Sequence, residues 1–133
     1  MAAKSRTLSN SFLNAALTAV SYAGPATVYT ALNTTASTAT APGTEDVDTT
    51  YARIPTTFST ATTGTTSNTG ILAFYGAGRT GNVTPSATIV EAAIYTALTG
   101  GTELYFGALA VPKTVAVGDT LSFAALALSI TEA

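Results

Sequence analysis

The sequence contains no cysteine, no histidine and no tryptophan. Without cysteine the chain has no disulfide, no thiol chemistry and no zinc-thiolate site. Without histidine a serine triad lacks its usual base, and a metal site lacks its commonest ligand. The acids Glu91, Glu103, Asp119 and Glu132 are scattered along the sequence and do not form the pair that a glycosidase needs. We therefore expect a protein that is not an enzyme and that uses no cofactor or metal.

Charge is scarce as well. Charged residues make up 9% of the 133 residues, against roughly a quarter in an average soluble domain. Five basic and seven acidic residues give a net charge of −2, with no basic stripe that would bind phosphates. Nucleic acid is therefore not an expected partner. A surface rich in Thr, Ala and Ser is typical of a protein covered by copies of itself or by a larger assembly, so we expect a homo-oligomer.

Long apolar runs are also missing. No stretch approaches the ~18 apolar residues of a membrane-spanning helix, and we expect no membrane partner. The N-terminus, with two basic residues before FLNAALTAVSYA and AGPA, has the layout of a secretory signal. Polar residues interrupt its apolar part, however, which favours the alternative of a short amphipathic helix. Its apolar residues are Phe12, Leu13, Ala16, Leu17 and Val20, and Ser9 or Asn10 is the expected N-cap.

Short segments rich in β-branched and aromatic residues, separated by turn residues, follow Gly24-Pro25. Pro55 should place its strand at a sheet edge or at a bend. A polar run over 62–69 and a long surface loop over 33–50 separate the strands. The expected strands cover residues 26–32, 51–54, 56–60, 70–75, 86–98, 103–111 and 121–130.

Two details refine this pattern. Residues 86–98 contain enough alanine for a helix, but Pro85 before them, their β-branched residues and the following Gly100-Gly101 favour a strand that enters a hairpin. In the last segment, Leu121 and Phe123 have the opposite parity to Leu128 and Ile130, which predicts a bulge or bend near residues 124–125.

The sequence thus predicts an all-β protein, a jelly-roll-like β-sandwich of six to eight short strands with a short N-terminal helix. Residues 1–24 should form an N-terminal arm with the helix, and residues 25–133 the β-sandwich domain.

Three motifs invite a chemical interpretation. The glycines of GAGRTG, residues 76–81, follow an expected strand as in a dinucleotide site, but Pro85 argues against the helix that such a site requires. The acidic EDVD segment, residues 45–48, lacks the spacing of a calcium loop and is interpreted as a solvated loop. The six tyrosines, which a carbohydrate-binding module or adhesin would use as a sugar platform, are expected to pack in the interior or at an interface.

The order of several segments resembles a family of small virion proteins of tailed bacteriophages, commonly labelled tail-fibre-like. It also resembles the β-sandwich cement proteins that decorate phage capsids. The similarity runs from about Leu8 to Ile130, and its most specific parts are GTE with YAR, residues 43–45 and 51–53, and the terminal stretch GGTELYFGALAVPKTVAVGDTLSF, residues 100–123.

The resemblance implies a protein of the virion. It implies a capsid decoration protein, bound to the major capsid protein as a homotrimer, or alternatively a tail-fibre or tailspike tip that binds a host-surface glycan. Phe12, Leu13 and Leu17 would be capsid or inter-subunit contacts. The resemblance assigns Gly100 and Gly101 to a hairpin turn, Pro112 to a corner between strands, and Gly118 and Asp119 to the turn into the last strand.

Overall fold

The computed structural model describes residues 2–132. Over this range the regular structure consists of one helix and nine strands, one strand more than the upper end of the expected six to eight. No helix in this part of the chain has the length and apolar character needed to cross a bilayer. The elements are β1 (Ala3–Lys4), α1 (Arg6–Leu17), β2 (Val28–Asn33), β3 (Ile54–Thr56), β4 (Thr65–Ser67), β5 (Leu72–Phe74), β6 (Ser86–Tyr95), β7 (Glu103–Ala116), β8 (Leu121–Phe123) and β9 (Ser129–Thr131).

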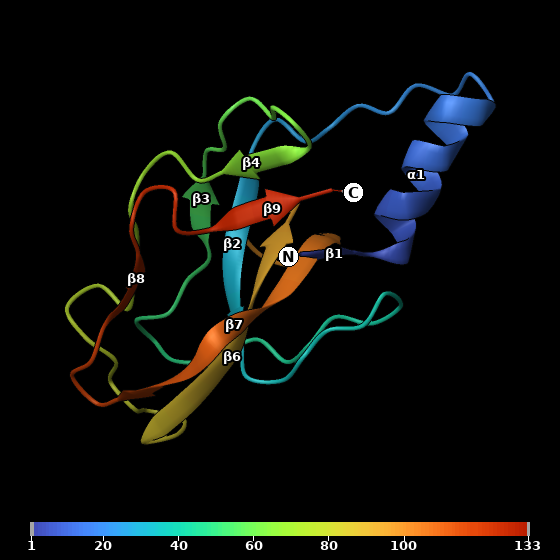
Figure 1. The fold of residues 1–133 in the computed structure, drawn as a ribbon. Helices are drawn as coiled ribbons and strands as arrows, with labels where there is room; N and C mark the ends of the chain where they lie inside the picture. The colour runs from blue at the N-terminus through green and yellow to red at the C-terminus, as the bar shows by residue number, and fades with distance from the viewer. Residues whose placement is uncertain (1, 133) are drawn as a thin grey trace.

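Five strands form the main antiparallel sheet, in the order β1-β7-β6-β2-β3. Its long central strands run through the middle of the molecule in Figure 1. Pro55 lies in β3, the edge strand, where the missing N–H of proline costs no ladder bond. At the other edge the two-residue β1 pairs with β7 at Tyr105 and Phe106. Of the N-terminal arm, Ala3 and Lys4 are therefore part of the sheet.

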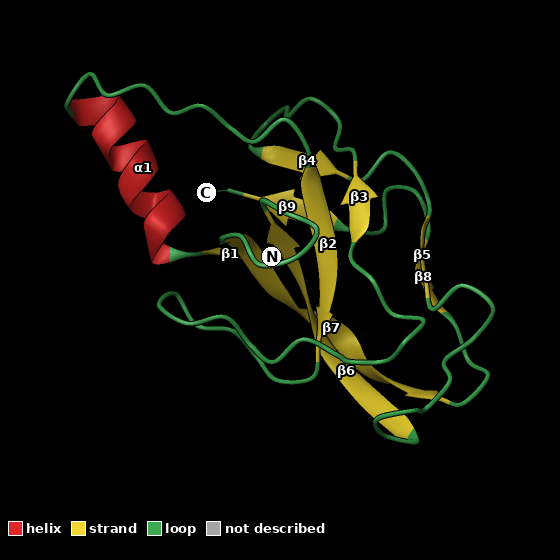
Figure 2. Ribbon diagram, turned by 180° about the vertical axis from the view of Figure 1, so that it is seen from behind, coloured by secondary structure: helices red, strands yellow, loops and turns green. Residues whose placement is uncertain are grey.

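Two small strand pairs, β4 with β9 and β5 with β8, supply the second layer. Figure 2 shows them against the main sheet. The largest apolar cluster fills the space between the layers, which confirms the all-β, sandwich-like fold with an N-terminal helix. Its buried members are Leu32, Leu72, Phe74, Tyr75, Ile89, Val115 and Leu121.

The segment over 86–98 is a strand, as expected, from Ser86 to Tyr95. A loop from Thr96 to Thr102 then leads into β7, and the backbone N–H of Thr96 donates to the carbonyl of Thr102 at 3.1 Å. Gly100 and Gly101 lie in this loop with φ of +62° and +73°. Residues with a Cβ avoid this left-handed conformation, so the two glycines are what allow the chain to reverse here.

The predicted corner at Pro112 is wrong in one respect, because β7 does not end there. It continues from Glu103 to Ala116 with a large bulge. Ile89 of β6 faces Lys113, whereas Glu91 faces Ala108, so four residues of β7 stand opposite Val90 alone. Pro112 lies within this bulge, where the ladder is already interrupted and its missing N–H leaves no partner unsatisfied.

The parity change near the C-terminus corresponds to a turn between two strands. Residues 124–128 separate β8 from β9, Leu126 has φ of +66°, and the two strands pair with β5 and β4 respectively. Sequence patterning does not predict β4, because its three residues, Thr65, Thr66 and Ser67, lie in the polar run over 62–69 that is typical of a loop. They form a strand because they pair with β9. In this pairing Thr66 lies opposite Ile130, 64 residues further along the chain.

Candidate functional site

The helix α1 stands out from the sandwich. The Ser5 hydroxyl caps it by accepting a hydrogen bond from the backbone N–H of Leu8 at 3.3 Å, so the expected cap at Ser9 or Asn10 is wrong. The helix ends at Leu17, since Thr18 leaves helical geometry and Ala19 has φ of +56°. Leu8 is the one buried residue of this helix. Figure 1 shows α1 beside the sandwich, connected to β2 by a long arm.

The three apolar residues expected to make contacts do not lie on one face. Residues four apart share a helix face, so Phe12 lies on the same face as Leu8, and its ring meets that of Tyr22 in the arm after the helix edge-on at 5.0 Å. Leu13 and Leu17 form a separate pair, with 57% and 78% of their surface exposed. We call this pair the α1 ridge. Phe12 thus braces the arm, while the ridge is free to contact a partner.

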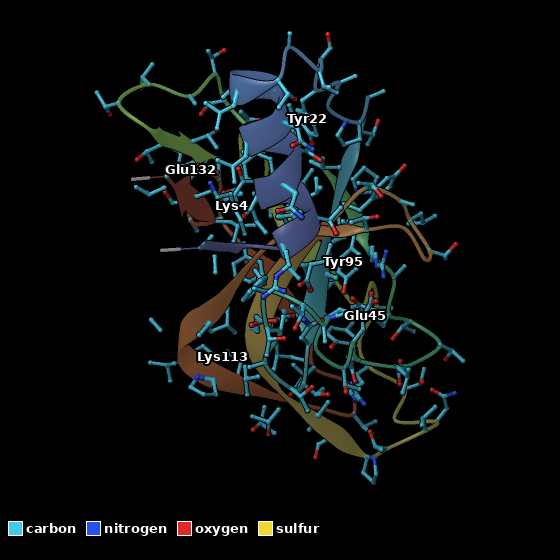
Figure 3. The ribbon with its side chains drawn as sticks, turned by 90° about the vertical axis from the view of Figure 1, so that its right-hand side faces the viewer. Lys4, Tyr22, Glu45, Tyr95, Lys113 and Glu132 are labelled. Carbon is cyan, nitrogen blue, oxygen red and sulfur yellow. The ribbon has the colours of Figure 1, made fainter. Side chains whose placement is uncertain are left out.

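A second candidate surface runs along β7, which borders residues 127–130 on one side and β8 on the other. Two adjoining hollows of about 320 and 790 Å³ share Leu109, Ala110 and Phe123 as lining residues. Val111, which is 63% exposed, lines the larger hollow. We call the combined feature the β7–β8 groove. Among residues 2–132, Lys113 and Asp119 are its sole charged lining residues, and Figure 3 shows Lys113 on the outer part of β7, away from the helix.

The turn that follows β7 borders this groove. Gly118 has φ of +84°, and its backbone N–H donates to the carbonyl of Arg79. The Asp119 carboxylate accepts a hydrogen bond from the backbone N–H of Ala116 at 3.0 Å, which closes the turn. Gly118 and Asp119 thus hold the end of β7 close to the loop that carries Arg79.

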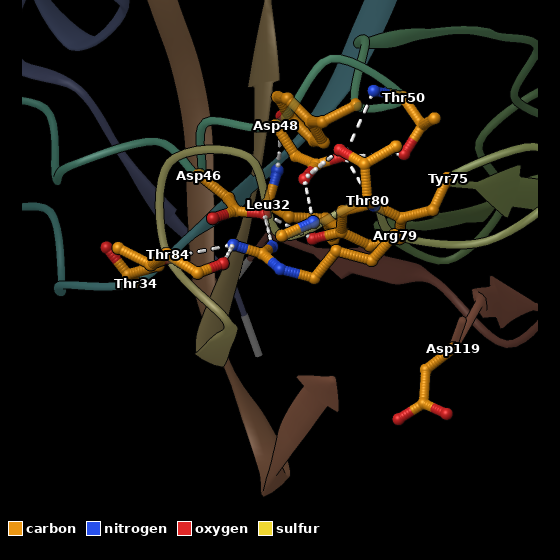
Figure 4. A network of polar contacts seen from close by, with 12 residues as sticks. Leu32, Thr34, Asp46, Asp48, Thr50, Tyr75, Arg79, Thr80, Thr84 and Asp119 are labelled. Atoms are coloured by element: carbon orange, nitrogen blue, oxygen red, sulfur yellow. Dashed lines mark hydrogen bonds and ion pairs between the residues drawn. The ribbon is translucent and has the colours of Figure 1, made fainter. Parts of the chain in front are cut away.

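The interpretation of the acidic EDVD segment, residues 45–48, as a solvated loop is wrong, because two of its carboxylates are buried. Asp46 is 5% exposed, and its carboxylate accepts hydrogen bonds from the Arg79 guanidinium at 2.5 Å and from the Tyr75 hydroxyl at 2.6 Å. The Arg79 side chain, which is fully buried, also donates to the Thr84 hydroxyl at 2.9 Å. Figure 4 shows this network. The glycine-rich segment therefore carries a buried arginine that ties two loops together.

Asp48 stabilises the same junction. Its carboxylate accepts hydrogen bonds from the backbone N–H groups of Thr50, Thr80 and Gly81 and from the hydroxyls of Thr50 and Thr80. Burial alone would raise the pKa of Asp48, but the hydrogen bonds from Thr50 and Thr80 outweigh it and hold this pKa well below its ordinary value. Asp48 is thus a structural carboxylate that joins the loop before β3 to the loop before β6.

The segments GTE and YAR are brought together in space. The Glu45 carboxylate accepts hydrogen bonds from the Tyr51 hydroxyl at 2.6 Å and from the Arg53 guanidinium at 2.8 Å. Arg53 also donates to the carbonyls of Ala97 and Gly100 in the hairpin loop, and it stacks on the Tyr95 ring at 3.7 Å. Its role is to fix the hairpin loop to the edge of the sheet.

Two further buried carboxylates, Glu91 and Glu103, lie under the loop that follows β2. The Ser37 hydroxyl is 2.6 Å from Glu91 and 2.8 Å from Glu103, and it accepts hydrogen bonds from Asn33 and from the backbone N–H of Gly43. Burial raises the pKa of Glu103, and the nearby Glu91 raises it further against the hydrogen bonds from Ser37 and Tyr95. Asn33 and Ser37 donate hydrogen bonds to Glu91, and Ser37 and Tyr95 lie within hydrogen-bond distance of Glu103. Glu91 and Glu103 therefore belong to an internal hydrogen-bond network.

Most of the tyrosines also take part in hydrogen bonds within the protein. Four of the six hydroxyls donate to carboxylates, and burial is the main cause that raises their pKa values. The pairs are Tyr51 with Glu45, Tyr75 with Asp46, Tyr95 with Glu103 and Tyr105 with Glu132. A sugar platform needs exposed rings that lie together, whereas Tyr75 and Tyr95 are buried.

The fold and these side chains define a β-rich structural module in which buried polar networks fix the loops, while apolar surfaces on α1 and along β7 and β8 are left exposed. Residues 3–131 match the family described as Podophage GP4 fiber I protein gp80, and the chain belongs to this family. It is therefore a structural protein of a phage virion. No curated protein matches the sequence.

Proposed function

We propose that this chain is a module of a podophage tail fibre, without enzymatic activity, that works by binding other proteins of the virion. The observation that carries the proposal is the match of residues 3–131 to a fibre protein family. The sequence resemblance left two virion functions open, capsid decoration and a tail fibre. The family description favours the fibre over our first expectation, a homotrimeric cement protein bound to the major capsid protein.

The distribution of polar groups supports a binding role rather than a chemical one. The buried carboxylates Asp46, Glu91 and Glu103 each have hydrogen-bond partners within the protein. Such paired groups rigidify loops and are not free to bind a substrate. Host-glycan recognition, the other role considered for a fibre tip, gains little support from tyrosines that are used internally.

The exposed apolar groups support attachment to protein. Leu13, Leu17 and Val111 are each more than half exposed. Single exposed apolar residues are common, but a protruding pair on a helix and a lined groove are features of protein contact sites. In a fibre, these surfaces would join the module to its neighbours.

Locating the protein on the particle tests the proposal. Virions of the phage that encodes this chain would be labelled with gold-conjugated antibodies raised against the purified protein, and antibodies against the major capsid protein would serve as control. We expect label at the tail, with far fewer copies by quantitative mass spectrometry than the major capsid protein. Label spread over the shell, with a copy number comparable to that of the capsid protein, would instead establish capsid decoration and overturn the fibre proposal.

A further inference from the structure

We propose that Glu91 and Glu103 share one proton, and that this proton holds the loop over residues 34–44 against the main sheet. When the proton is lost, the loop is released, together with the contact that it makes with the start of α1. The inference concerns the interior of the fold. It is therefore independent of whether the particle carries the protein on a fibre or on the shell.

The number of hydrogens at Ser37 carries the inference. A serine hydroxyl has one hydrogen to donate and two lone pairs that accept. The Ser37 oxygen lies 2.6 Å from Glu91 Oε1 and 2.8 Å from Glu103 Oε2, and both distances are those of an O–H···O hydrogen bond. One hydrogen cannot serve two ionised carboxylates. A proton on one carboxyl group supplies the missing hydrogen, because that group donates to Ser37 while Ser37 donates to the other.

The lone pairs of Ser37 leave room for such a donor. The backbone N–H of Gly43 donates to the Ser37 oxygen at 2.8 Å and occupies one lone pair. Asn33 Nδ2 is 3.1 Å from the same oxygen but only 2.7 Å from Glu91 Oε1, so its bond to Ser37 is the weaker of the two. A carboxyl O–H can therefore take the second lone pair.

Glu103 is the group that holds the proton. Glu91 accepts hydrogen bonds from Asn33 and from both the hydroxyl and the backbone N–H of Ser37, and donors of this kind favour the ionised form of a carboxyl group. Glu103 is 6% exposed and lies against the hydroxyls of Ser37 and Tyr95. Burial and the charge of Glu91 both raise the pKa of Glu103, in agreement with this assignment.

The other charges around Glu103 do not offset these effects. Neither the loop over 34–44 nor the hairpin loop over 96–102 contains a titratable residue. Arg53 lowers the pKa of Glu103, but its guanidinium stacks on the Tyr95 ring and is already paired with a carboxylate. The titratable groups on the surrounding elements are Glu91 and Tyr95 on β6, Arg53 with its partner Glu45 beside β3, Lys4 of β1 with its partner Glu132, and the exposed Arg6 of α1.

The same hydroxyl is the anchor of the loop. Among residues 34–44, Ser37 is the one that is buried, and both its backbone N–H and its hydroxyl meet Glu91. Further along the loop, the carbonyl of Ala39 accepts a hydrogen bond from the backbone N–H of Arg6 at 2.6 Å, where α1 begins. The charge state of the pair therefore acts on the loop and, through the loop, on the base of the helix.

Rising pH opens the loop. The pKa of Glu103 is above its ordinary value of 4.5 while the loop is closed, and it returns toward that value when the loop opens to water. The loop is therefore held most firmly below this ordinary value. Its opening equilibrium should increase by up to about tenfold per pH unit from there to the raised pKa, and then level off.

A titration of the side-chain carboxyl carbons by nuclear magnetic resonance tests the shared proton. The chain has four glutamates, so their signals can be assigned individually. We expect Glu103 of the wild type to titrate above 4.5, and the variant E103Q to lose this step while Glu91 stays ionised. Titration of both Glu91 and Glu103 at or below 4.5 in the wild type would overturn the proposal. This measurement needs no variant, so it decides the question even where E103Q fails to fold.

Amide hydrogen exchange over residues 34–44 tests the release of the loop. After correction for the intrinsic rate, protection in the wild type should fall as the pH rises from about 4 to 8. In E103Q it should not change with pH, because the amide of glutamine donates as the neutral carboxyl group does. E132Q is the matched control: Glu132 also accepts from a tyrosine hydroxyl, on the other side of the helix base, and this variant should keep the wild-type fall. Protection that is independent of pH in the wild type, or a fall that persists in E103Q, would refute the release of the loop.

Discussion

The buried ion pair between Arg79 and Asp46 offers the sharpest test of how this fold is held together. The Arg79 side chain is fully buried and that of Asp46 is 3% exposed. In the variant R79M, Asp46 keeps its bond from Tyr75 but loses its cation, and the Thr84 hydroxyl loses its donor. A carboxylate stripped of its partner in a buried site costs about 3–5 kcal/mol of folding free energy.

The exposed pair between Lys4 and Glu132 is the matched control. Its distance of 2.8 Å is close to that of the buried pair, but its side chains are 33% and 34% exposed. The variant K4M should therefore lose no more than about 1 kcal/mol. Denaturant unfolding followed by circular dichroism measures both losses, and R79M should melt roughly 10–15 °C below the wild type. Equal losses in the two variants would refute the argument that burial decides the strength of these pairs.

Three further predictions follow from single side chains. Because the pKa of Glu103 is raised in the folded protein, ionisation at that site opposes folding as the pH rises above its ordinary value near 4.5. E103Q should therefore raise the melting temperature at pH 7 and lose this advantage at acidic pH; an advantage that persists unchanged in acid would contradict the assignment. G101A should unfold at lower denaturant than G100A, since both positions have positive φ but a Cβ at Gly101 would lie 2.7 Å from the Thr96 hydroxyl, whereas at Gly100 it meets open space. S5A should cost about 1 kcal/mol of stability through loss of the helix cap, and an unchanged unfolding midpoint would show that the cap is dispensable.

Local patterns were sufficient to predict much of the sheet. Runs such as Ser86 to Tyr95 contain the β-branched and aromatic residues that favour extended backbone, and glycine pairs mark the reversals between them. Pro55 at an edge strand follows from its missing N–H. These features depend on a residue and its near neighbours, which a single sequence displays directly.

The polar networks depend on residues far apart in the sequence. Asp46 and Arg79 are 33 positions apart, and Asn33 meets Glu91 across 58 positions. Nothing in the local pattern of EDVD or GAGRTG distinguishes a buried carboxylate from a solvated one. The resemblance made GTE and YAR two of its most specific segments, but it assigned no role to Glu45 or Arg53 and did not indicate that the two side chains meet.

The candidate contact residues were predicted in part. Helical spacing identified Phe12, Leu13 and Leu17 as apolar residues of one helix. Helical spacing does not show which of these residues face the sandwich. The position of the sandwich decides that, and the structure shows it through Leu8, the buried residue of α1. The β7–β8 groove had no sequence signal, since it results from the bulge in β7 and from the second layer's short strands.

Many of the few charged residues in this protein are buried. Of the five basic and seven acidic residues, five are buried, namely Asp46, Asp48, Arg79, Glu91 and Glu103. Among residues 2–132, Arg6 and Lys113 are the two cations that form no ion pair with a carboxylate. The outer surface is therefore even poorer in charge than the sequence suggests. Any contact made by this surface would rely on apolar burial and hydrogen bonds, and salt screens both far less than it screens exposed ion pairs.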